Sequence, residues 1–402
     1  VHAEKPDALL ALFGEAWRSN GDTVERIELL ATKLVSGEVE CKDSWPATQA
    51  VLEGIDRLIA PAVEGCGPSE LEGLLTALDG RFVPPGPSGA PTRGRLDVLP
   101  TGRNFYSVDT RAVPTPAAWY LGQKSADLLL RRHRQEHGEW PAALALSAWG
   151  TSNMRTGGDD VAQALALIGA RPVWDHGSRR VTGTEIITLA ELGRPRVDVT
   201  LRISGFFRDA FPAQIELFDR ACRAVAALDE DDADNPMAAR VRAQAAQLEA
   251  EGRDAESARR SAGHRVFGSK PGAYGAGLQA LIDEKAWTDK ADLAEAYLQW
   301  GSYAYGAKEE GTAARTEFET RLASVDAVVQ NQDNREHDLL DSDDYYQFEG
   351  GISAAVEELS GERPAIYHND HSAASAPEWS TRYGPLASCA TAIRVPSKWR
   401  RP

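Results

Sequence analysis

The spacing of apolar residues changes along the chain and predicts which segments form helices and which form strands. Within residues 1–81 apolar positions recur at helical intervals, as in 24–35 and 48–60, with glycine and proline between the runs. The stretch 82–95, FVPPGPSGAPTRGR, holds too much proline and glycine to sustain either element. We therefore expect a helical support region over 1–81, followed by a linker or wrapping loop.

Beyond residue 96, short apolar runs alternate with amphipathic stretches, which is the pattern of stacked β-α-β units. Within 96–262 the strand-like segments are 142–149, 172–174 and 197–204. The helical segments are 116–137, 161–169 and much of 212–260. After residue 263 the alternation resumes, with helices near 278–300, 312–324 and 345–360 and strands at 326–330 and 365–367. The pattern predicts an α/β protein, in which a helical N-terminal segment precedes two Rossmann-like lobes with many helices, over 96–262 and 263–372. An irregular tail over 373–402 follows.

Composition narrows the class of protein. The 402 residues with 42% hydrophobic content are enough for two or three domains with real cores. The net charge of −16 disfavours nucleic acid as a partner, because phosphate contacts need a basic face. No apolar run is long enough to span a bilayer, and the four cysteines are scattered without a C-x-x-C pair. We expect a soluble, cytoplasmic chain with no membrane span, zinc site or disulfide framework.

The segment 149–160, WGTSNMRTGGDD, carries the most informative chemistry. It follows a predicted strand and precedes a predicted helix, so it lies at the carboxyl end of a strand, where open α/β sheets bind ligands. Its polar residues suit a cation beside an anionic organic ligand: Asn153, Arg155, Asp159 and Asp160. Capping of the following helix explains either aspartate equally well.

Three further loops combine glycine with polar side chains: 99–109, 204–212 and 343–351. The first loop has four side chains that could bind an anion and a carbonyl group, although a hydrogen-bonded turn explains them more simply: Arg103, Asn104, Tyr106 and Asp109. In the second, Arg208 beside Asp209 forms either an internal ion pair or a ligand contact. In the third, aromatic neighbours would partly bury Glu349, which disfavours its charged form and makes it a candidate proton acceptor.

His368 and His371 flank Asp370 at the end of a predicted strand. Imidazole is a good ligand for cobalt-like or zinc-like ions, and a neighbouring carboxylate fixes its tautomer, although ordinary hydrogen bonds explain a histidine pair nearly as well. The glycine-rich FGSKPGAYG lacks the order of a nucleotide-binding P-loop. If ATP is used, we expect another chain to bind it.

Nine blocks, in order over roughly residues 80–372, resemble the large, porphyrin-binding subunit of the multisubunit tetrapyrrole metal chelatases. The blocks are VPPGPSG, LPTGRNFYSVD, WGTSNMRTGGDD, RRVTG, ELGRPRVDV, FRD, RVFGSKPGAYGAGL, DDYYQFEGG and YHNDHS. The family has a cobalt branch, aerobic cobaltochelatase, and a magnesium branch, magnesium chelatase. FGSKPGAYGAGL, YYQFEGG and the D-H-S ending resemble the cobalt branch.

This resemblance implies a ligase that inserts Co²⁺, its metal substrate, into hydrogenobyrinic acid a,c-diamide in aerobic cobalamin biosynthesis. It implies two partners, a AAA+ ATPase subunit and a subunit with an integrin-like domain, which use ATP and Mg²⁺ while this chain binds neither. Asp159 occupies the place of a glutamate thought to handle the metal in the magnesium branch.

Insertion requires removal of two pyrrole protons and dehydration of a divalent cation, for which carboxylates and imidazoles are suitable acceptors and transient ligands. We expect the proton relay to comprise Asp159 and Asp160 with Glu349 or His371. The metal would pass through Asp159, His368 and His371. The substrate's carboxylates and carbonyl groups would be bound by Arg103, Asn104, Tyr106, Asn153, Arg155 and Arg208.

The chain differs from the family in two respects. Family subunits are much longer, so we expect a C-terminal fragment that is inactive alone, and the tail after Ser372 matches only at PSKW. Two alternatives remain open. One is a non-catalytic tetrapyrrole-binding or scaffold protein derived from a chelatase, and the other is a magnesium-branch subunit acting on protoporphyrin IX.

Overall fold

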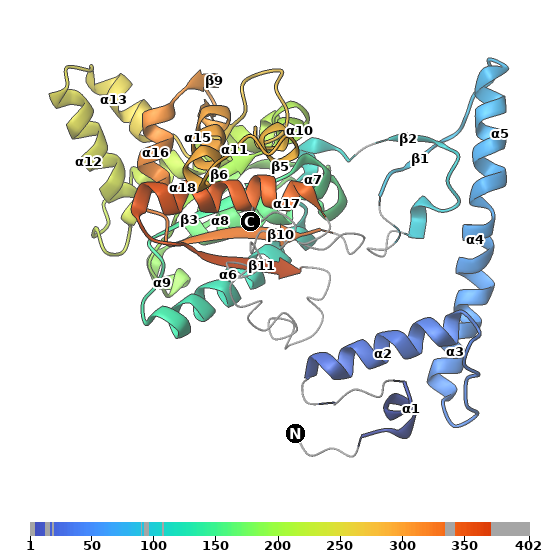
Figure 1. Ribbon diagram of the computed structural model, residues 1–402. Helices are drawn as coiled ribbons and strands as arrows, with labels where there is room; N and C mark the ends of the chain where they lie inside the picture. Colours follow the sequence, from blue (N-terminus) through green and yellow to red (C-terminus); the bar gives the residue numbers. More distant parts are fainter. Residues whose placement is uncertain are drawn as a thin grey trace. The chain divides into compact units, whose positions relative to one another are not determined.

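The computed structural model describes residues 5–12, 17, 20–89, 91, 96–106, 108–333 and 342–370 (Figure 1). The chain forms two compact units, and the boundary between them in the sequence lies between Ser107 and Val108. None of the described helices is both long enough and apolar enough to cross a membrane.

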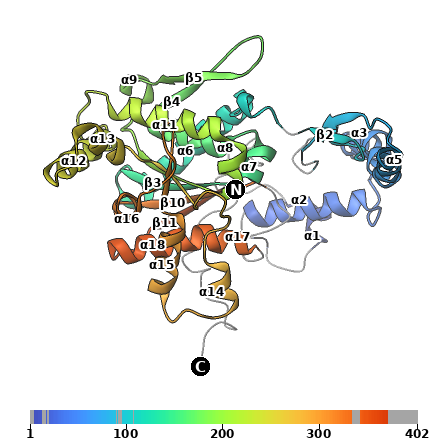
Figure 2. The same ribbon diagram turned by 90° about the horizontal axis from the view of Figure 1, so that it is seen from above.

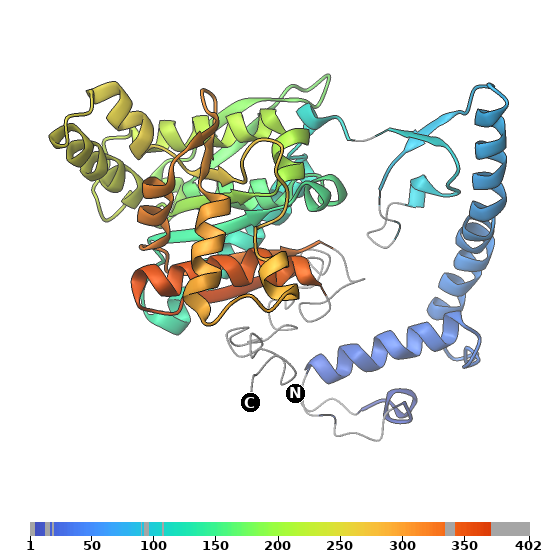
Figure 3. The same ribbon diagram turned by 45° about the horizontal axis from the view of Figure 1, so that its top comes forward.

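The first unit is mostly helical, as the sequence predicts (Figure 3). Its elements are α1 (Asp7–Leu10), α2 (Asn20–Val35), α3 (Pro46–Gly54), the π-helical turn η1 (Ile55–Ile59), α4 (Ala60–Glu64), α5 (Cys66–Leu78) and the 3-10 turn η3 (Leu96–Val98). Contrary to the expectation of a structureless linker, Pro85–Pro87 forms strand β1, paired in parallel with β2 (Asn104–Tyr106). Proline lacks a donor but keeps its carbonyl, and Pro84 accepts a hydrogen bond from the Asn104 amide at 3.0 Å.

The second unit is built on one seven-stranded sheet with the order β11-β10-β3-β6-β7-β8-β9. The strands from β11 to β7 run parallel, and β8 and β9 are antiparallel additions at one edge. Their bounds are β3 (Ala143–Ala148), β6 (Asp198–Ile203), β7 (Val266–Gly268), β8 (Tyr303–Tyr305), β9 (Glu310–Ala313), β10 (Ala327–Gln332) and β11 (Ala365–Asp370).

This single sheet corrects the prediction of two Rossmann-like lobes divided at residue 262. Strand β10, from the second predicted lobe, pairs with β3 from the first, so both predicted lobes contribute to the same layer. Alternating α and β segments look the same in one lobe or two, because periodicity does not identify the partner of a strand. The expected strand 172–174 also lies outside the main sheet, in an antiparallel hairpin of β4 (Ala170–Trp174) and β5 (Val181–Ile186).

Helices cover both faces of the sheet (Figure 2). One face packs against α6 (Pro116–His137), α8 (Asp159–Ile168) and α11 (Pro212–Ala226). The other packs against α15 (Lys290–Gly301), α16 (Arg315–Leu322) and α18 (Gly351–Ser360). Because successive strand residues alternate sides, Leu144 and Leu146 enter the first core and Ala145 enters the second.

The remaining elements connect these layers, and some differ from the sequence prediction. The expected helix 278–300 is divided into α14 (Gln279–Asp283) and α15, and strand β9 occupies the start of the expected helix 312–324. Short or peripheral elements are η4 (Thr110–Ala112), α7 (Gly150–Thr156), α9 (Leu189–Leu192), α10 (Gly205–Ala210), α12 (Pro236–Ala250), α13 (Ala255–Ala262), α17 (Asp343–Tyr345) and the π-helical turn η5 (Tyr346–Gly350).

The topology defines where a ligand would bind. From β3 the chain continues to β6 on one side, and only later returns to place β10 on the other side of β3. The order therefore reverses between β3 and β10, and open α/β sheets bind ligands outside the carboxyl ends of strands at such a switch point. The predicted loop 149–160 follows β3 at this position.

Candidate functional site

The segment after β3 forms two short helices joined by a glycine turn. α7 ends at Thr156, and Gly157 and Gly158 both have positive φ, +73° and +96°. A β-carbon on Gly158 would collide with Val113, so this tight turn requires glycine. α8 then begins at Asp159, and both aspartates are almost fully buried.

Asp160 is bound by side chains from other segments. Its two carboxylate oxygens accept hydrogen bonds from the Ser152 hydroxyl at 3.0 Å and from the Asn331 amide group at 2.7 Å. At the start of α8 the Thr156 hydroxyl accepts from the backbone amides of Gly158 and Asp159. Asp160 therefore does more than face the start of its own helix, because it joins α7, α8 and β10.

The other polar residues of this segment also have defined partners. Buried Asn153 donates to the side-chain oxygen of Gln214 at 2.9 Å. Arg155, with 34% of its side chain exposed, forms a 2.5 Å ion pair with Asp333, which is 2% exposed. Asp333 was not among the predicted site residues. It follows β10, whose last residues the sequence prediction had assigned to a loop.

Glu349 and His368 meet at the same edge of the sheet. Glu349 lies in the π-helical turn η5 and is buried, and its carboxylate is in close contact with the Nε2 atom of His368 on β11. Both residues are among those predicted from the sequence, and the structure brings them together. His371, predicted as a relay and metal ligand, lies outside the described residues.

Tyr345 indicates how close the acidic groups are to one another. Its ring lies 5.2 Å from the ring of Trp149 and 5.8 Å from that of His368, measured between centroids. Burial raises the pKa of Tyr345, and so do the negative charges of the acidic residues around it: Asp333, Glu349 and Asp160. The segments after β3 and β10 and the η5 turn therefore form one cluster, which we call the carboxylate site: Asp160, Asp333, Glu349 and His368.

Arg208 has an internal ion pair, one of the two alternatives that its sequence left open. Its guanidinium forms two hydrogen bonds with Asp209, at 2.6 and 2.8 Å. It also donates to the carbonyl oxygens of Lys270 and Ala273, both at 2.9 Å. These contacts hold the glycine-rich loop after β7 beside α10, and a contact of Arg208 with substrate stays a prediction.

Arg103, Asn104 and Tyr106 belong to the first compact unit, whereas the carboxylate site belongs to the second. The Arg103 guanidinium donates to the carbonyl oxygens of its own turn, those of Asp97, Leu99 and Pro100. The simpler alternative of a hydrogen-bonded turn therefore holds for Arg103. A role of these three residues in substrate binding remains a prediction.

The residue types at the site limit the chemistry that it can support. Carboxylates and imidazoles are the side chains that most often accept and donate protons in enzymes. Among the described residues, no three or more histidine, cysteine, aspartate or glutamate side chains are grouped so that they could hold a metal ion. The fold and site thus define an α/β protein with buried carboxylates and a histidine at the switch point of its sheet.

Comparison with known proteins specifies this class further. The chain belongs to the CobN/magnesium chelatase family, whose model matches residues 3–390. This match is wider than the stretch 80–372 that carried the resemblance, so it includes most of the first unit and part of the tail. The chain spans about a third of the length of the cobaltochelatase relatives that it matches.

Individual relatives come from both branches. The chain is 67% identical to an aerobic cobaltochelatase subunit CobN of Sinorhizobium sp, over 98% of this chain and 31% of the relative. It is 38% identical to the chloroplastic magnesium-chelatase subunit ChlH of Oryza sativa subsp. japonica, over 77% of this chain and 22% of the relative. A solved structure, the catalytic subunit of cobaltochelatase from Mycobacterium tuberculosis, matches 90% of this chain and 31% of its own, with 47% identity and a TM-score of 0.76.

Proposed function

We propose that this chain is the part of a cobaltochelatase large subunit in which Co²⁺ enters hydrogenobyrinic acid a,c-diamide during aerobic cobalamin biosynthesis. One observation carries the proposal. A buried group of carboxylates and an imidazole lies at the switch point of a chain that is 67% identical to an aerobic cobaltochelatase subunit. The greater identity to the cobalt branch than to the magnesium branch supports cobalt as the metal.

A corrin ring has one exchangeable inner N–H, so insertion of Co²⁺ releases one proton, rather than the two that a porphyrin loses, and the site must supply an acceptor for it. The Glu349–His368 pair can take one proton and share it. Asp159 at the start of α8 is the proposed transient ligand of Co²⁺ and an alternative acceptor for the proton. Asp160, whose oxygens already accept two hydrogen bonds, contributes fixed negative charge beside it.

Arg155 is the proposed contact for a peripheral carboxylate of the substrate, because its guanidinium is partly exposed beside the buried site. The energy for insertion would come from ATP hydrolysis, with Mg²⁺, on a AAA+ partner subunit. A second partner with an integrin-like domain would transmit that step. The glycine-rich FGSKPGAYG lacks the P-loop motif, which supports the proposal that another chain binds ATP.

Substitution of Asp159 tests the assignment. A complete large subunit carrying Asp159→Asn should bind the macrocycle almost normally and insert no cobalt, because the amide can neither accept the proton nor bind Co²⁺ as a carboxylate does. Insertion is followed by absorbance with both partners, ATP and Co²⁺ present. Asp232→Asn, at an exposed surface carboxylate, is the control. Normal turnover by the Asp159 variant would refute the role.

The two alternatives predict different results with the unaltered subunit. A non-catalytic tetrapyrrole-binding protein would bind the macrocycle and insert no metal even with both partners and ATP. A magnesium-branch subunit would prefer protoporphyrin IX to hydrogenobyrinic acid a,c-diamide in a competition assay.

A further inference from the structure

One transverse row of the main sheet brings polar side chains into the core beneath α15 and α18. His368 of β11 is paired with Gln330 of β10, and Ser147 of β3 is paired with Arg202 of β6. The register between β10 and β3 makes Gln330 and Ser147 neighbours as well. The row therefore runs across four adjacent strands, from the carboxylate site to Arg202.

Arg202 is the unusual member of this row. Its side chain is fully buried, and one guanidinium nitrogen, Nη1, donates to the carbonyl oxygen of Ile203. Within the described residues, the Nε and Nη2 atoms of Arg202 have no hydrogen-bond partner at hydrogen-bonding geometry. No carboxylate of the described residues forms an ion pair with this guanidinium. The guanidinium contacts two aromatic residues: its carbon lies 5.5 Å from the ring centre of Tyr297, which also interacts with it electrostatically, and 5.4 Å from that of Phe348.

Such a residue is not explained by stability. A buried charge without an ionic partner loses its hydration, and an apolar side chain of similar length commonly leaves stability unchanged or raises it. Burial lowers the pKa of Arg202, which reflects the same cost. The surrounding structure makes room for the guanidinium, since a β-carbon on Gly301 of α15 would come within 3.1 Å of Nε.

The aromatic contacts connect Arg202 to the site. Phe348 immediately precedes Glu349 in the π-helical turn η5, and its ring also lies 5.6 Å from that of Trp149, the residue after β3. A cation over an aromatic face favours one placement of the ring more than an apolar contact does. π-helical turns are rare and often occur at functional sites, where they set the direction of a side chain.

We propose that Arg202 is a positioning residue for the carboxylate site. Its guanidinium, between Tyr297 and Phe348, fixes the η5 turn from the side of the sheet and so holds Glu349 against His368. The inference rests on the proposed function for its catalytic consequence, whereas the effect on the η5 turn is independent of any activity.

Two substitutions in the complete subunit separate the charge from the space it fills. Arg202→Met keeps an unbranched chain and removes the cation, and Arg202→Lys keeps a cation near Phe348. We expect Arg202→Met to lower kcat for cobalt insertion by on the order of tenfold to a hundredfold, because misplacing a reacting group by about 1 Å costs that much. KM for the macrocycle and Tm should stay as in the unaltered subunit, and Arg202→Lys should recover part of kcat.

Hydrogen exchange provides a readout that does not need activity. Backbone amides of residues 346–350 should exchange faster in Arg202→Met than in the unaltered subunit, and those of 116–137 should not change. Thr200→Val, on the same strand and the same face, is the control and should leave both exchange and kcat unaltered.

The outcomes are distinct. Slow exchange of the η5 turn in Arg202→Met would overturn the proposal. So would normal kcat in an active complex, or a joint fall of kcat, KM and Tm that Arg202→Lys does not rescue. If the unaltered complex inserts no cobalt, the proposed function fails while the exchange result still decides the role of Arg202.

Discussion

At the scale of single residues, Asn331 organises the carboxylate site. Its amide group donates to Asp160 and to Gln163, both at 2.7 Å, and its carbonyl oxygen accepts from Asn369 at 2.8 Å. One buried side chain therefore links α8, β10 and β11. In such a network each member orients the others, and the loss of one leaves several buried polar groups unsatisfied.

Substitution of Asn331 should therefore destabilise the protein and do so in a pH-dependent way. Asn331→Ala should lower the free energy of unfolding by about 2–4 kcal/mol, since buried groups lose partners at about 1–3 kcal/mol each. Asn331→Asp places a second carboxylate against Asp160. The free energy of unfolding of this variant should therefore fall more at pH 7 than at pH 5, where the two carboxylates can share a proton. Urea denaturation at the two pH values measures both effects. Equal stability of Asn331→Asp and the unaltered chain at pH 7 would contradict this account.

The sequence predicted part of this site. Loop 149–160 was assigned to the carboxyl end of a strand because an apolar run precedes it, and that placement is confirmed. Asp333 was missed because the expected strand ended at 330, whereas β10 continues to Gln332. The pairing of Glu349 with His368 joins residues of a turn and a strand, and their local sequence contains no signal for it.

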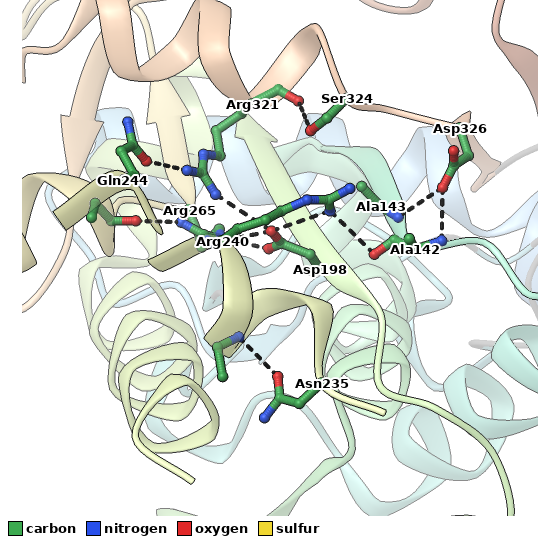
Figure 4. A network of polar contacts seen from close by, with 12 residues as sticks. Ala142, Ala143, Asp198, Asn235, Arg240, Gln244, Arg265, Arg321, Ser324 and Asp326 are labelled. Carbon is green, nitrogen blue, oxygen red and sulfur yellow. Dashed lines mark hydrogen bonds and ion pairs between the residues drawn. The ribbon is translucent and has the colours of Figure 1, made fainter. Parts of the chain in front are cut away.

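At the scale of elements, a network of ion pairs joins several segments at the amino end of strand β6. Asp198, the first residue of β6, accepts from Arg265 at 2.5 and 3.2 Å, from Arg321 at 3.4 Å and from Arg240 at 3.5 Å (Figure 4). The three arginines join α12, α16 and the residue before β7 to one carboxylate. Burial acts to raise the pKa of Asp198, but the charges of Arg265 and Arg321 outweigh it, and the pKa lies below its ordinary value.

The sign of the pH effect follows from that shift. A carboxyl with a depressed pKa in the folded state stabilises the protein above its unfolded pKa, and the contribution is lost as pH falls through the folded value. Asp198→Asn should therefore lower the free energy of unfolding by about 3–5 kcal/mol at pH 7, because three buried or partly buried cations lose their partner. The difference from the unaltered chain should narrow as pH falls below about 4.

Denaturation curves over that range measure the difference, with Asp232→Asn as control. Asp232 pairs with Arg242 at the surface, with 77% of its side chain exposed, and exposed pairs contribute about 0–1 kcal/mol. Equal effects of the two substitutions would show that the Asp198 network is not a centre of stability. Sequence reasoning did not identify this network, because its partners stand 42 to 123 positions apart.

At the scale of the whole molecule, the two units differ in how they are stabilised. Both apolar cores consist only of residues from 108 onward, on the two faces of the sheet. In the first unit, α3, α4 and α5 bury no residue, and the leucines of α5 are more than half exposed: Leu71, Leu74, Leu75 and Leu78. Helical spacing predicted these helices correctly, but it does not say whether an apolar face is covered.

The distribution of the cores predicts that the second unit folds without the first. A chain that begins at Val108 should unfold cooperatively, with a Tm within about 4 °C of the full chain, because a loss of about 1 kcal/mol shifts a domain of this size by no more than that. Residues 1–107 alone should show helical circular dichroism that declines gradually on heating, since short helices without a buried face unfold with little cooperativity. Thermal unfolding of the three chains by circular dichroism and calorimetry tests both statements. Broad unfolding of the chain from Val108 would mean that the sheet and its two cores need the first unit in order to fold.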